Sequence, residues 1–420
     1  MIVNHFLFIF GLLVYAGYGI PGFCYLAVAV ILAYTLGRLI PKHKWLLWPG
    51  VAANGLWLLF VKLQPVTGFS LLAPLGISYF TLRIISYMAD VYKGVQEPER
   101  DFSRFALTMT YLPHLFLGPI EPYGTMASAL FEARKITWSG IADGLVRLAW
   151  GGFKKLVIAA RLGVVIGTIT KDPSVYNGAY ALAACLLYSI QLYADFSGGI
   201  DMVLGVSRML GIRLSENFQS PYLSESIQEF WRRWHITLGA WFRKYVYIPL
   251  GGSRKGTLRK MLNTMIVFLV SGIWHGIEYL LWGVGHGIGV LFGKKLQTKS
   301  KLVNRFGTTL VVSLLWAFFV WPTAALAGKM LLSIFTTFNY GAFFAGISEL
   351  GLTVGDWIVL GAAVVLLTVY DGWVAKWKAL WAKLRPWAKT AVIGALALFV
   401  VLFGMYGIGF NAESFIYSRF

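Results

Sequence analysis

Apolar stretches long enough to cross a lipid bilayer recur along the whole chain. A spanning helix needs roughly 17 to 25 mostly apolar residues, and lipid offers no partner for an unpaired backbone group, so each stretch is predicted to be helical. We place them near residues 6–21, 23–40, 46–63, 70–89, 105–120, 144–170, 176–205, 262–281, 281–293, 307–327, 355–370 and 390–410. The pattern predicts an all-α, polytopic integral membrane protein with roughly ten to twelve crossings plus re-entrant or interfacial helices.

The composition supports this prediction. Of the 420 residues, 58% are hydrophobic and only 13% are charged, whereas charged residues make up about a quarter of a soluble domain. The sequence contains no internal repeat of solenoid length and no low-complexity linker. We therefore expect one integral-membrane domain over residues 1–420.

The formal net charge of +19 changes the picture only slightly. The basic residues are scattered among short loops, such as Lys154 and Lys155 or the run from Lys294 to Arg305. The positive-inside rule and anionic lipid headgroups account for this distribution. It indicates the lipid bilayer of the plasma membrane as the partner and argues against nucleic acid.

The segment that begins at Ser226 is predicted to be one amphipathic helix. Ser226 and Glu229 have the spacing of a capping box. At 100° per residue, aromatic and aliphatic side chains such as Trp234 gather on one half of the helix. The other half carries the basic residues Arg232, Arg233, Arg243 and Lys244. These are expected to anchor the helix at the membrane boundary, where a charged donor could also dock.

Two histidines are expected to face the protein interior. His235 falls on the apolar half of the amphipathic helix, and His275 lies in the apolar sequence "SGIWHG". An ionisable side chain within a membrane span marks a functional site by default, although a neutral imidazole bonded in the bundle core is the alternative. A neutral imidazole can act as a general base toward a hydroxyl.

His286 is eleven residues beyond His275, about three turns away on a continuous helix. This separation excludes joint metal ligation from one helix, so we expect a packing or pore-lining role and no metal site. The surrounding "GVGHGIG" follows no predicted strand and lacks the spacing of a dinucleotide-binding motif.

The segments around His235 and His275 resemble a known protein family. The stretches "FWRRWHITLGAWFRKYVYIPLGGSRKG" and "SGIWHG" closely resemble the membrane-bound O-acyltransferase family. The branch concerned includes the bacterial alginate O-acetyltransferase membrane subunit and the teichoic-acid D-alanyl transfer protein. The resemblance extends to "PLGISYFTLRIISYMADVYKG", "YLPHLFLGPIEPY", "QLYADFSGGIDMVLG", "SENFQSPY" and the end "ESFIYSRF".

The resemblance implies a fold and a set of site residues. The fold would be a ring of tilted helices around a central tunnel, with the family core at about residues 70–295. The essential histidine of the family's W-H-G element maps onto His275, and the second family position maps onto His235. Asp195 and Asn217 match family motifs and could line the site, or could simply be buried hydrogen-bonding residues. Trp234, Trp274 and His286 are further candidates for lining it.

The resemblance also implies acyl transfer in a bacterial plasma membrane. His275 would take the proton of an acceptor hydroxyl as it attacks a thioester carbonyl, while His235 would orient the acceptor or share the proton. The donor would be acetyl-CoA or a phosphopantetheine carrier protein, with no permanently bound cofactor and no metal.

Acetylation of a cell-surface polysaccharide leads among the possible reactions, directly or through an extracytoplasmic acyl-transfer partner protein. D-alanylation of teichoic acid, with a cytoplasmic acyl carrier protein, is the alternative. A transporter or flippase also fits the helix count, but it would predict inverted repeats with broken helices, and the sequence has none.

Overall fold

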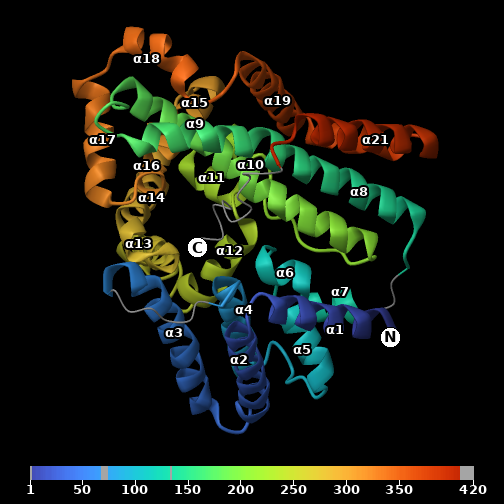
Figure 1. The fold of residues 1–420 in the computed structure, drawn as a ribbon. Helices are drawn as coiled ribbons and strands as arrows, with labels where there is room; N and C mark the ends of the chain where they lie inside the picture. Colours follow the sequence, from blue (N-terminus) through green and yellow to red (C-terminus); the bar gives the residue numbers. More distant parts are fainter. Residues whose placement is uncertain (1, 68–73, 133–134, 407–420) are drawn as a thin grey trace.

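Helices make up nearly all of the regular structure in the computed structural model, which describes residues 2–67, 74–132 and 135–406 (Figure 1). Within those ranges the only pairing of extended backbone is an isolated antiparallel bridge between Phe218 and Trp234. The all-α prediction is confirmed. Parts of the predicted spans 70–89 and 390–410, and the C-terminal "ESFIYSRF", lie outside the described residues.

The N-terminal helices form the lower half of the molecule in Figure 1. They are α1 (Ile2–Gly17), α2 (Ile20–Leu39), α3 (Leu47–Thr67), α4 (Ile77–Tyr92), α5 (Phe102–Thr110), α6 (Leu112–Phe116) and α7 (Tyr123–Phe131). The predicted single span at 105–120 is wrong, because the chain breaks at Tyr111, which has ψ of 111° and precedes α6. A proline at 113 in the first turn of α6 favours a new helix start there.

Two helices run side by side across the upper half of the molecule in Figure 1, α8 (Trp138–Gly152) and the long α10 (Ala179–Met209). The first continues through a π-helical turn (Phe153–Ala159) into α9 (Ala160–Lys171). A Cβ atom on Gly144 would lie 2.5 Å from the carbonyl oxygen of Gly205, and one on Gly151 would lie 2.5 Å from that of Gly198. The two backbones therefore touch at glycine pairs, as is typical of packed membrane helices.

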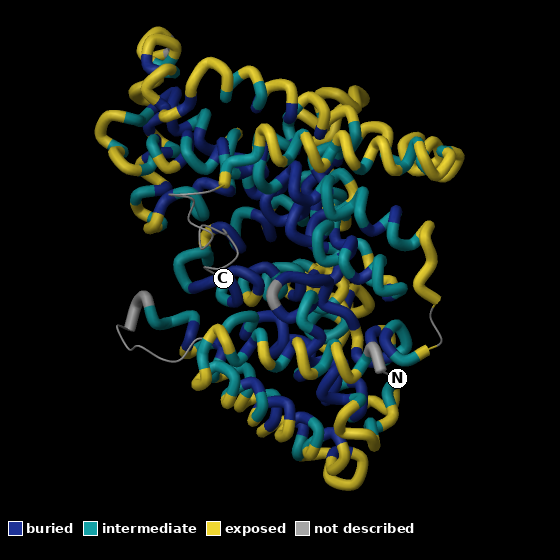
Figure 2. The backbone as a smooth tube through the Cα atoms, turned by 45° about the vertical axis from the view of Figure 1, so that its right-hand side comes forward, coloured by how far each residue is buried: buried dark blue, intermediate teal, exposed yellow. Residues whose placement is uncertain are grey.

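The remaining helices complete the bundle. They are α11 (Ile227–Arg233), α12 (Ile236–Phe242), α13 (Gly256–His275), α14 (Leu280–Phe292), α15 (Lys301–Leu315), α16 (Ala317–Val320), α17 (Ala324–Thr336), α18 (Tyr340–Gly346), α19 (Val354–Gly372), α20 (Val374–Lys383) and α21 (Pro386–Phe403). Figure 2 shows burial concentrated in the centre, with the outermost helices largely exposed. No residue of α21 is buried, although its sequence is strongly apolar. An apolar helix that is exposed in this way is suited to contact with lipid.

Six helices in the described part of the chain are long and apolar enough to cross a membrane, or seven if a bent pair counts as one span. The predicted ten to twelve crossings are therefore not confirmed. One of the missing spans has a clear local cause, because α14 has only 13 residues. The preceding helix α13 has 20 residues and ends at His275, where Gly276 has a φ of 153° that favours glycine.

The predicted continuous helix from Ser226 onward is also wrong, because it is broken at His235. The N-terminus itself is confirmed, since the Ser226 hydroxyl accepts a hydrogen bond from the backbone N–H of Glu229 at 3.2 Å. The helix α11 then ends at Arg233, and His235 has the left-handed backbone angles φ 45° and ψ 53°. The helix resumes as α12 and ends in a π-helical turn, Arg243–Tyr247. Tertiary pairing of Trp234 with Phe218 replaces the helical geometry at the break.

Candidate active site

His275 is the last residue of α13 and is 8% exposed. Aromatic rings surround it: the centroid distances are 4.6 Å to Trp274, 5.5 Å to Trp282 and 5.4 Å to Phe319. Because His275 stands at the end of α13, its imidazole packs against these rings in the buried part of the bundle. Its burial and surroundings agree with the predicted interior position.

His235 is 2% exposed and lies at the break between α11 and α12. Its ring packs edge-on against Phe196 of α10, with the centroids 4.9 Å apart. A histidine with positive φ is uncommon, and such a conformation persists only where surrounding contacts enforce it. Here the segment 217–219 enforces it by pairing with the chain on both sides of His235, because Gln219 N–H donates to Arg233 O and Ile236 N–H donates to Asn217 O, each at 3.0 Å.

Asn217 fixes the tautomer of His235. Its side-chain oxygen accepts hydrogen bonds from the backbone N–H and the hydroxyl of Thr237, at 3.1 and 2.9 Å. The third contact of this oxygen is Nδ1 of His235, at 3.2 Å. Because an amide oxygen can only accept, Nδ1 carries the proton and Nε2 is left with its lone pair. In the described part of the chain Nε2 has no hydrogen-bond partner.

Burial also keeps His235 neutral. It lowers the pKa of this imidazole from its ordinary value to about 3. A neutral imidazole with an accessible lone pair is the form that accepts a proton or orients a hydroxyl. The sequence predicted an interior histidine here, and His235 is buried; its catalytic role stays a prediction.

The two histidines, forty residues apart in the sequence, meet around one tryptophan. The ring of Trp274 lies 6.5 Å from that of His235 and 4.6 Å from that of His275, centroid to centroid. Lys62, on α3, is close enough for its positive charge to act on His275. Trp274, a predicted site-lining residue, thus lies close to both predicted catalytic side chains. Its indole Nε1–H is buried and has no hydrogen-bond partner in the described ranges.

His286 belongs to an adjoining aromatic cluster. It is fully buried, and its Nδ1 accepts a hydrogen bond from the indole N–H of Trp231 at 3.1 Å. Trp282 lies between it and His275, with ring centroids at 5.0 and 5.5 Å. This agrees with a packing role. Across the residues with a defined placement, no group of three His, Cys, Asp or Glu side chains could hold a metal ion.

The comparison with known proteins decides the family. Residues 101–337 match MBOAT, the membrane-bound O-acyltransferase family. The chain belongs to this family. The predicted acyltransferase class and the predicted multi-pass location in a bacterial membrane are thereby confirmed.

Curated MBOAT relatives carry three different activities in their names. A probable alginate O-acetylase of Pseudomonas fluorescens is 36% identical over 353 residues, which cover 80% of this chain and 69% of that protein. A peptidoglycan O-acetyltransferase of Helicobacter pylori is 33% identical over 285 residues, 59% of this chain and 54% of that protein. A teichoic acid D-alanyltransferase of Streptococcus thermophilus is 28% identical over 300 residues, 67% of this chain and 72% of that protein. The chain thus spans between about half and three quarters of these relatives' lengths.

The other predicted site residues of this MBOAT protein divide between the site and its surroundings. Asn217 lies in the site, as described above. Asp195, on α10, forms an ion pair with Lys155, so its carboxylate neutralises a partly buried lysine. Trp234 stacks on Phe230, with centroids 5.4 Å apart. It also forms the backbone bridge to Phe218 next to the helix break at His235.

The four basic residues have separate surroundings. Arg233 pairs with Glu229 at 2.5 Å, and Lys244 pairs with the buried Asp90 of α4 at 2.8 Å. Arg232 and Arg243 are exposed. Exposure of these two agrees with the predicted interfacial position, whereas Lys244 has a structural partner that the sequence did not reveal.

Sequence reasoning missed Thr237 and Lys62. Thr237 has no distinguishing motif, and it acts only because the segment around Asn217 folds back onto it. Lys62 lies in an apolar helix far from the histidines in sequence. An unpaired cation within a predicted span was the only signal that could have pointed to it.

Proposed function

We propose that the protein transfers an acetyl group from a cytoplasmic thioester donor, across the membrane, to a hydroxyl of an extracytoplasmic cell-surface polysaccharide or to a partner protein that completes the transfer. The observation that carries this proposal is the buried pair His275 and His235 around Trp274, with His235 held in one tautomer by Asn217. The higher identity to relatives named O-acetylases than to one named D-alanyltransferase favours acetyl over D-alanyl.

The two histidines can account for every proton transfer in the proposed reaction. The acceptor hydroxyl attacks the thioester carbonyl while His275 takes the hydroxyl proton. The tetrahedral intermediate then collapses, the C–S bond breaks, and the proton passes to the leaving thiolate. His235, through its lone pair at Nε2, orients the hydroxyl or shares the proton. This sequence of steps needs neither an oxidant nor a reductant.

Negative charge develops on the carbonyl oxygen during the attack, and a fixed N–H donor would stabilise it. We propose Trp274 for this role. Its buried Nε1–H lacks a protein partner within the described ranges, and its ring lies close to both histidines. The sequence had identified no donor for this charge.

The test uses purified protein in lipid vesicles, a radiolabelled acetyl thioester and a polysaccharide acceptor. His275→Ala should abolish acyl transfer, because no other group is proposed to take the hydroxyl proton, while the variant still inserts and elutes as the wild type does. His43→Ala is the matched control, since His43 is exposed before α3, and it should retain full activity. Normal transfer by His275→Ala would contradict the proposal.

A further inference from the structure

The extended segment that carries Asn217 is joined to the helices α8 and α10 by an arginine that the proposed mechanism does not use. Arg147 of α8 donates from Nη1 and Nη2 to the two carboxylate oxygens of Glu216, at 2.8 and 2.5 Å. Its Nε–H donates to Oδ1 of Asp201, on α10, at 2.9 Å. Glu216 directly precedes Asn217 in the chain. One guanidinium therefore links both helices to the residue next to the amide that orients His235.

Arg147 is itself held in a fixed position. The other oxygen of Asp201 accepts from Lys154 Nζ at 2.6 Å, and Lys154 also donates to the hydroxyl of Ser197 at 2.7 Å. Lys154 and Ser197 are both buried. A planar guanidinium that contacts a carboxylate through two nitrogens orients it more strictly than a single point charge does. The frame formed by α8 and α10 can therefore fix the position of Glu216.

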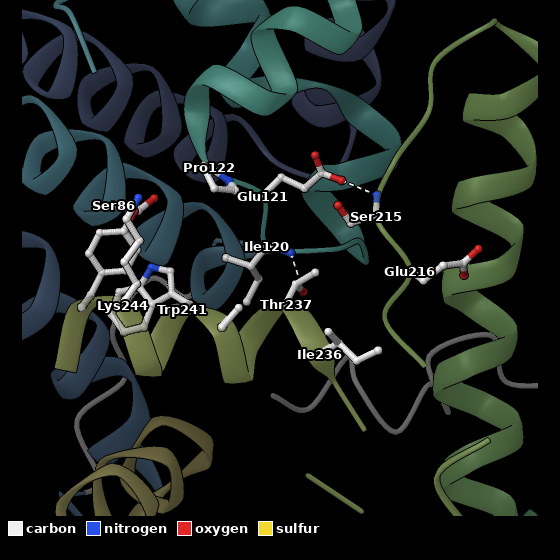
Figure 3. A pocket seen from close by; sticks show the side chains of 12 residues that line it. Ser86, Ile120, Glu121, Pro122, Ser215, Glu216, Ile236, Thr237, Trp241 and Lys244 are labelled. Carbon is white, nitrogen blue, oxygen red and sulfur yellow. Dashed lines mark hydrogen bonds between the residues drawn. The ribbon is translucent and has the colours of Figure 1, made fainter. Parts of the chain in front are cut away.

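The orientation of the Asn217 side chain depends on the backbone of this segment. Asn217 is fully buried, and its side-chain oxygen receives the contacts from His235 and Thr237. Its Nδ2, by contrast, has no hydrogen-bond partner among the residues with a defined placement. Figure 3 shows Glu216 on the far side of the segment from Thr237, with its carboxylate turned toward the neighbouring helix. The ion pair of Glu216 thus holds the segment from the side that the amide leaves without a contact.

A second ion pair between the same two helices provides a comparison. Arg208 of α10 donates to Asp143 of α8 at 3.2 Å, and both side chains are partly exposed, as those of Arg147 and Glu216 are. All four residues line one pocket of about 250 Å³. Neither Arg208 nor Asp143 adjoins the segment of Asn217 in the chain. Loss of this second pair therefore measures the effect of an ion pair between α8 and α10 without the link to the site.

We propose that Arg147 is a positioning residue for the acyl transfer: through Glu216 it holds Asn217 where the amide oxygen keeps the proton of His235 on Nδ1. The assignment rests on the proposed function. The contact between Asn217 and His235 is 3.2 Å long, so a shift of the segment by about 1 Å would break it. The imidazole could then carry its proton on Nε2, where no lone pair would be left for the acceptor hydroxyl. Arg147 itself touches no reacting group.

Kinetics of the purified protein in lipid vesicles test the assignment. Arg147→Lys keeps the positive charge but replaces the planar fork with a single ammonium. It should lower kcat about tenfold and leave the KM of donor and acceptor unchanged, because His235 is misplaced and substrate binding is not. Glu216→Gln, which weakens the same contact from the other side, should act in the same direction. Arg208→Lys is the matched control and should retain the wild-type kcat. Equal kcat values in the two lysine variants would overturn the assignment.

A double variant tests whether the effect passes through Asn217. Asn217→Leu removes the amide and should lower kcat by itself. If Arg147 acts by holding that amide, Arg147→Lys should leave the kcat of the Asn217→Leu protein unchanged. A further loss of about tenfold would mean that the two residues act independently, and the positioning role would be wrong.

The tautomer of His235 gives a readout that does not depend on activity. NMR of protein with isotope-labelled histidine distinguishes a ring nitrogen that carries a proton from one with a lone pair, and His235→Gln identifies the signals. The wild type should show the proton on Nδ1, whereas Arg147→Lys and Glu216→Gln should shift the population toward Nε2–H. If the tautomer shifts in this way but the wild type transfers no acetyl groups, the positioning role stands and the proposed function fails. If the wild type transfers acetyl groups and all three proteins show the same tautomer, the positioning role is wrong.

Discussion

At the scale of single residues, the site depends on the strained backbone of His235 and on the Asn217 side chain that holds its imidazole. His235 has a left-handed backbone, with a φ of 45°, which is uncommon for residues other than glycine. The strain is offset by the contacts of Asn217 with His235 and Thr237. These contacts hold Nδ1 against Asn217 and leave Nε2 without a hydrogen-bond partner among the described residues. The reactivity of the site therefore depends on a residue that need not touch the substrate.

The role of Asn217 can be tested through the pH dependence of the reaction. Because burial lowers the pKa of His235 to about 3, the wild type should lose no activity to protonation of His235 near neutral pH. Asn217→Asp keeps an acceptor for Nδ1–H but adds a negative charge, which favours the imidazolium and raises that pKa by about 1 to 3 units. The acid limb of the kcat/KM profile should move to higher pH. Asn217→Leu should lower kcat at every pH instead. An unshifted acid limb in Asn217→Asp would exclude His235 as a titrating participant.

The proposed oxyanion donor gives a second prediction at this scale. Trp274→Phe keeps an aromatic ring beside the histidines and removes the N–H. It should lower kcat by about 10²-fold, with little change in donor KM, because the lost interaction exists only in the transition state. Trp321→Phe is the control, since Trp321 is also buried with an unpaired indole N–H among the described residues. Equal kcat values for the two variants would contradict the assignment.

These residues also show which parts of the site can be predicted from the sequence. His275 could be predicted because an imidazole within an apolar span is costly, and His235 because it falls on the apolar half of an amphipathic segment. Both also stand in specific motifs. Asn217 could be found only as a motif match with an undecided role. Its hydrogen bonds to Thr237 and His235 are tertiary, and no local pattern encodes the partner of an extended segment.

At the scale of helices, the contact between α8 and α10 positions one side of the site. Their glycines recur every seven residues, at 144 and 151 on one helix and at 198 and 205 on the other. The backbones meet at these positions, and α10 presents Phe196 to the ring of His235. Close packing of small residues replaces the hydrophobic effect as the source of helix association in lipid.

A methyl group at this contact should therefore be costly. Gly151→Ala would place a Cβ atom 2.5 Å from the carbonyl oxygen of Gly198, and forcing the helices apart should destabilise the protein by about 1 to 3 kcal/mol. Gly361→Ala, in α19 with no atom within 4 Å of the added Cβ, should be neutral or slightly stabilising. Thermal unfolding in one detergent measures both. A Gly151→Ala variant as stable as Gly361→Ala would show that the helices do not touch here.

The amphipathic segment shows why element boundaries were harder to predict than element faces. The 100° pattern correctly separated an interior His235 from exposed Arg232 and Arg243. It could not reveal the break, because the bridge between Trp234 and Phe218 competes with helical hydrogen bonds only after the chain has folded. The same reasoning explains why α13 ends at His275, where Gly276 takes a backbone conformation that favours glycine.

At the scale of the whole molecule, the protein has a buried centre, which holds the two histidines, and an exposed apolar periphery (Figure 2). Composition alone predicted the apolar periphery, and the family motifs predicted the histidines of the centre. The number of crossings could not be read from hydropathy. The helices α13 and α14 pack against each other and carry apolar sequence, yet neither is among the candidate spans, and α14 has only 13 residues.

The central claim is that the protein transfers an acetyl group to a cell-surface polysaccharide. Mass spectrometry of surface polymers tests it most directly, in cells lacking the gene and in the same cells supplied with the wild type or with His275→Ala. The account predicts that polysaccharide acetyl groups disappear on deletion, return with the wild type and stay absent with His275→Ala. Unchanged acetylation in the deletion strain, or loss of D-alanyl groups from teichoic acid in its place, would contradict it.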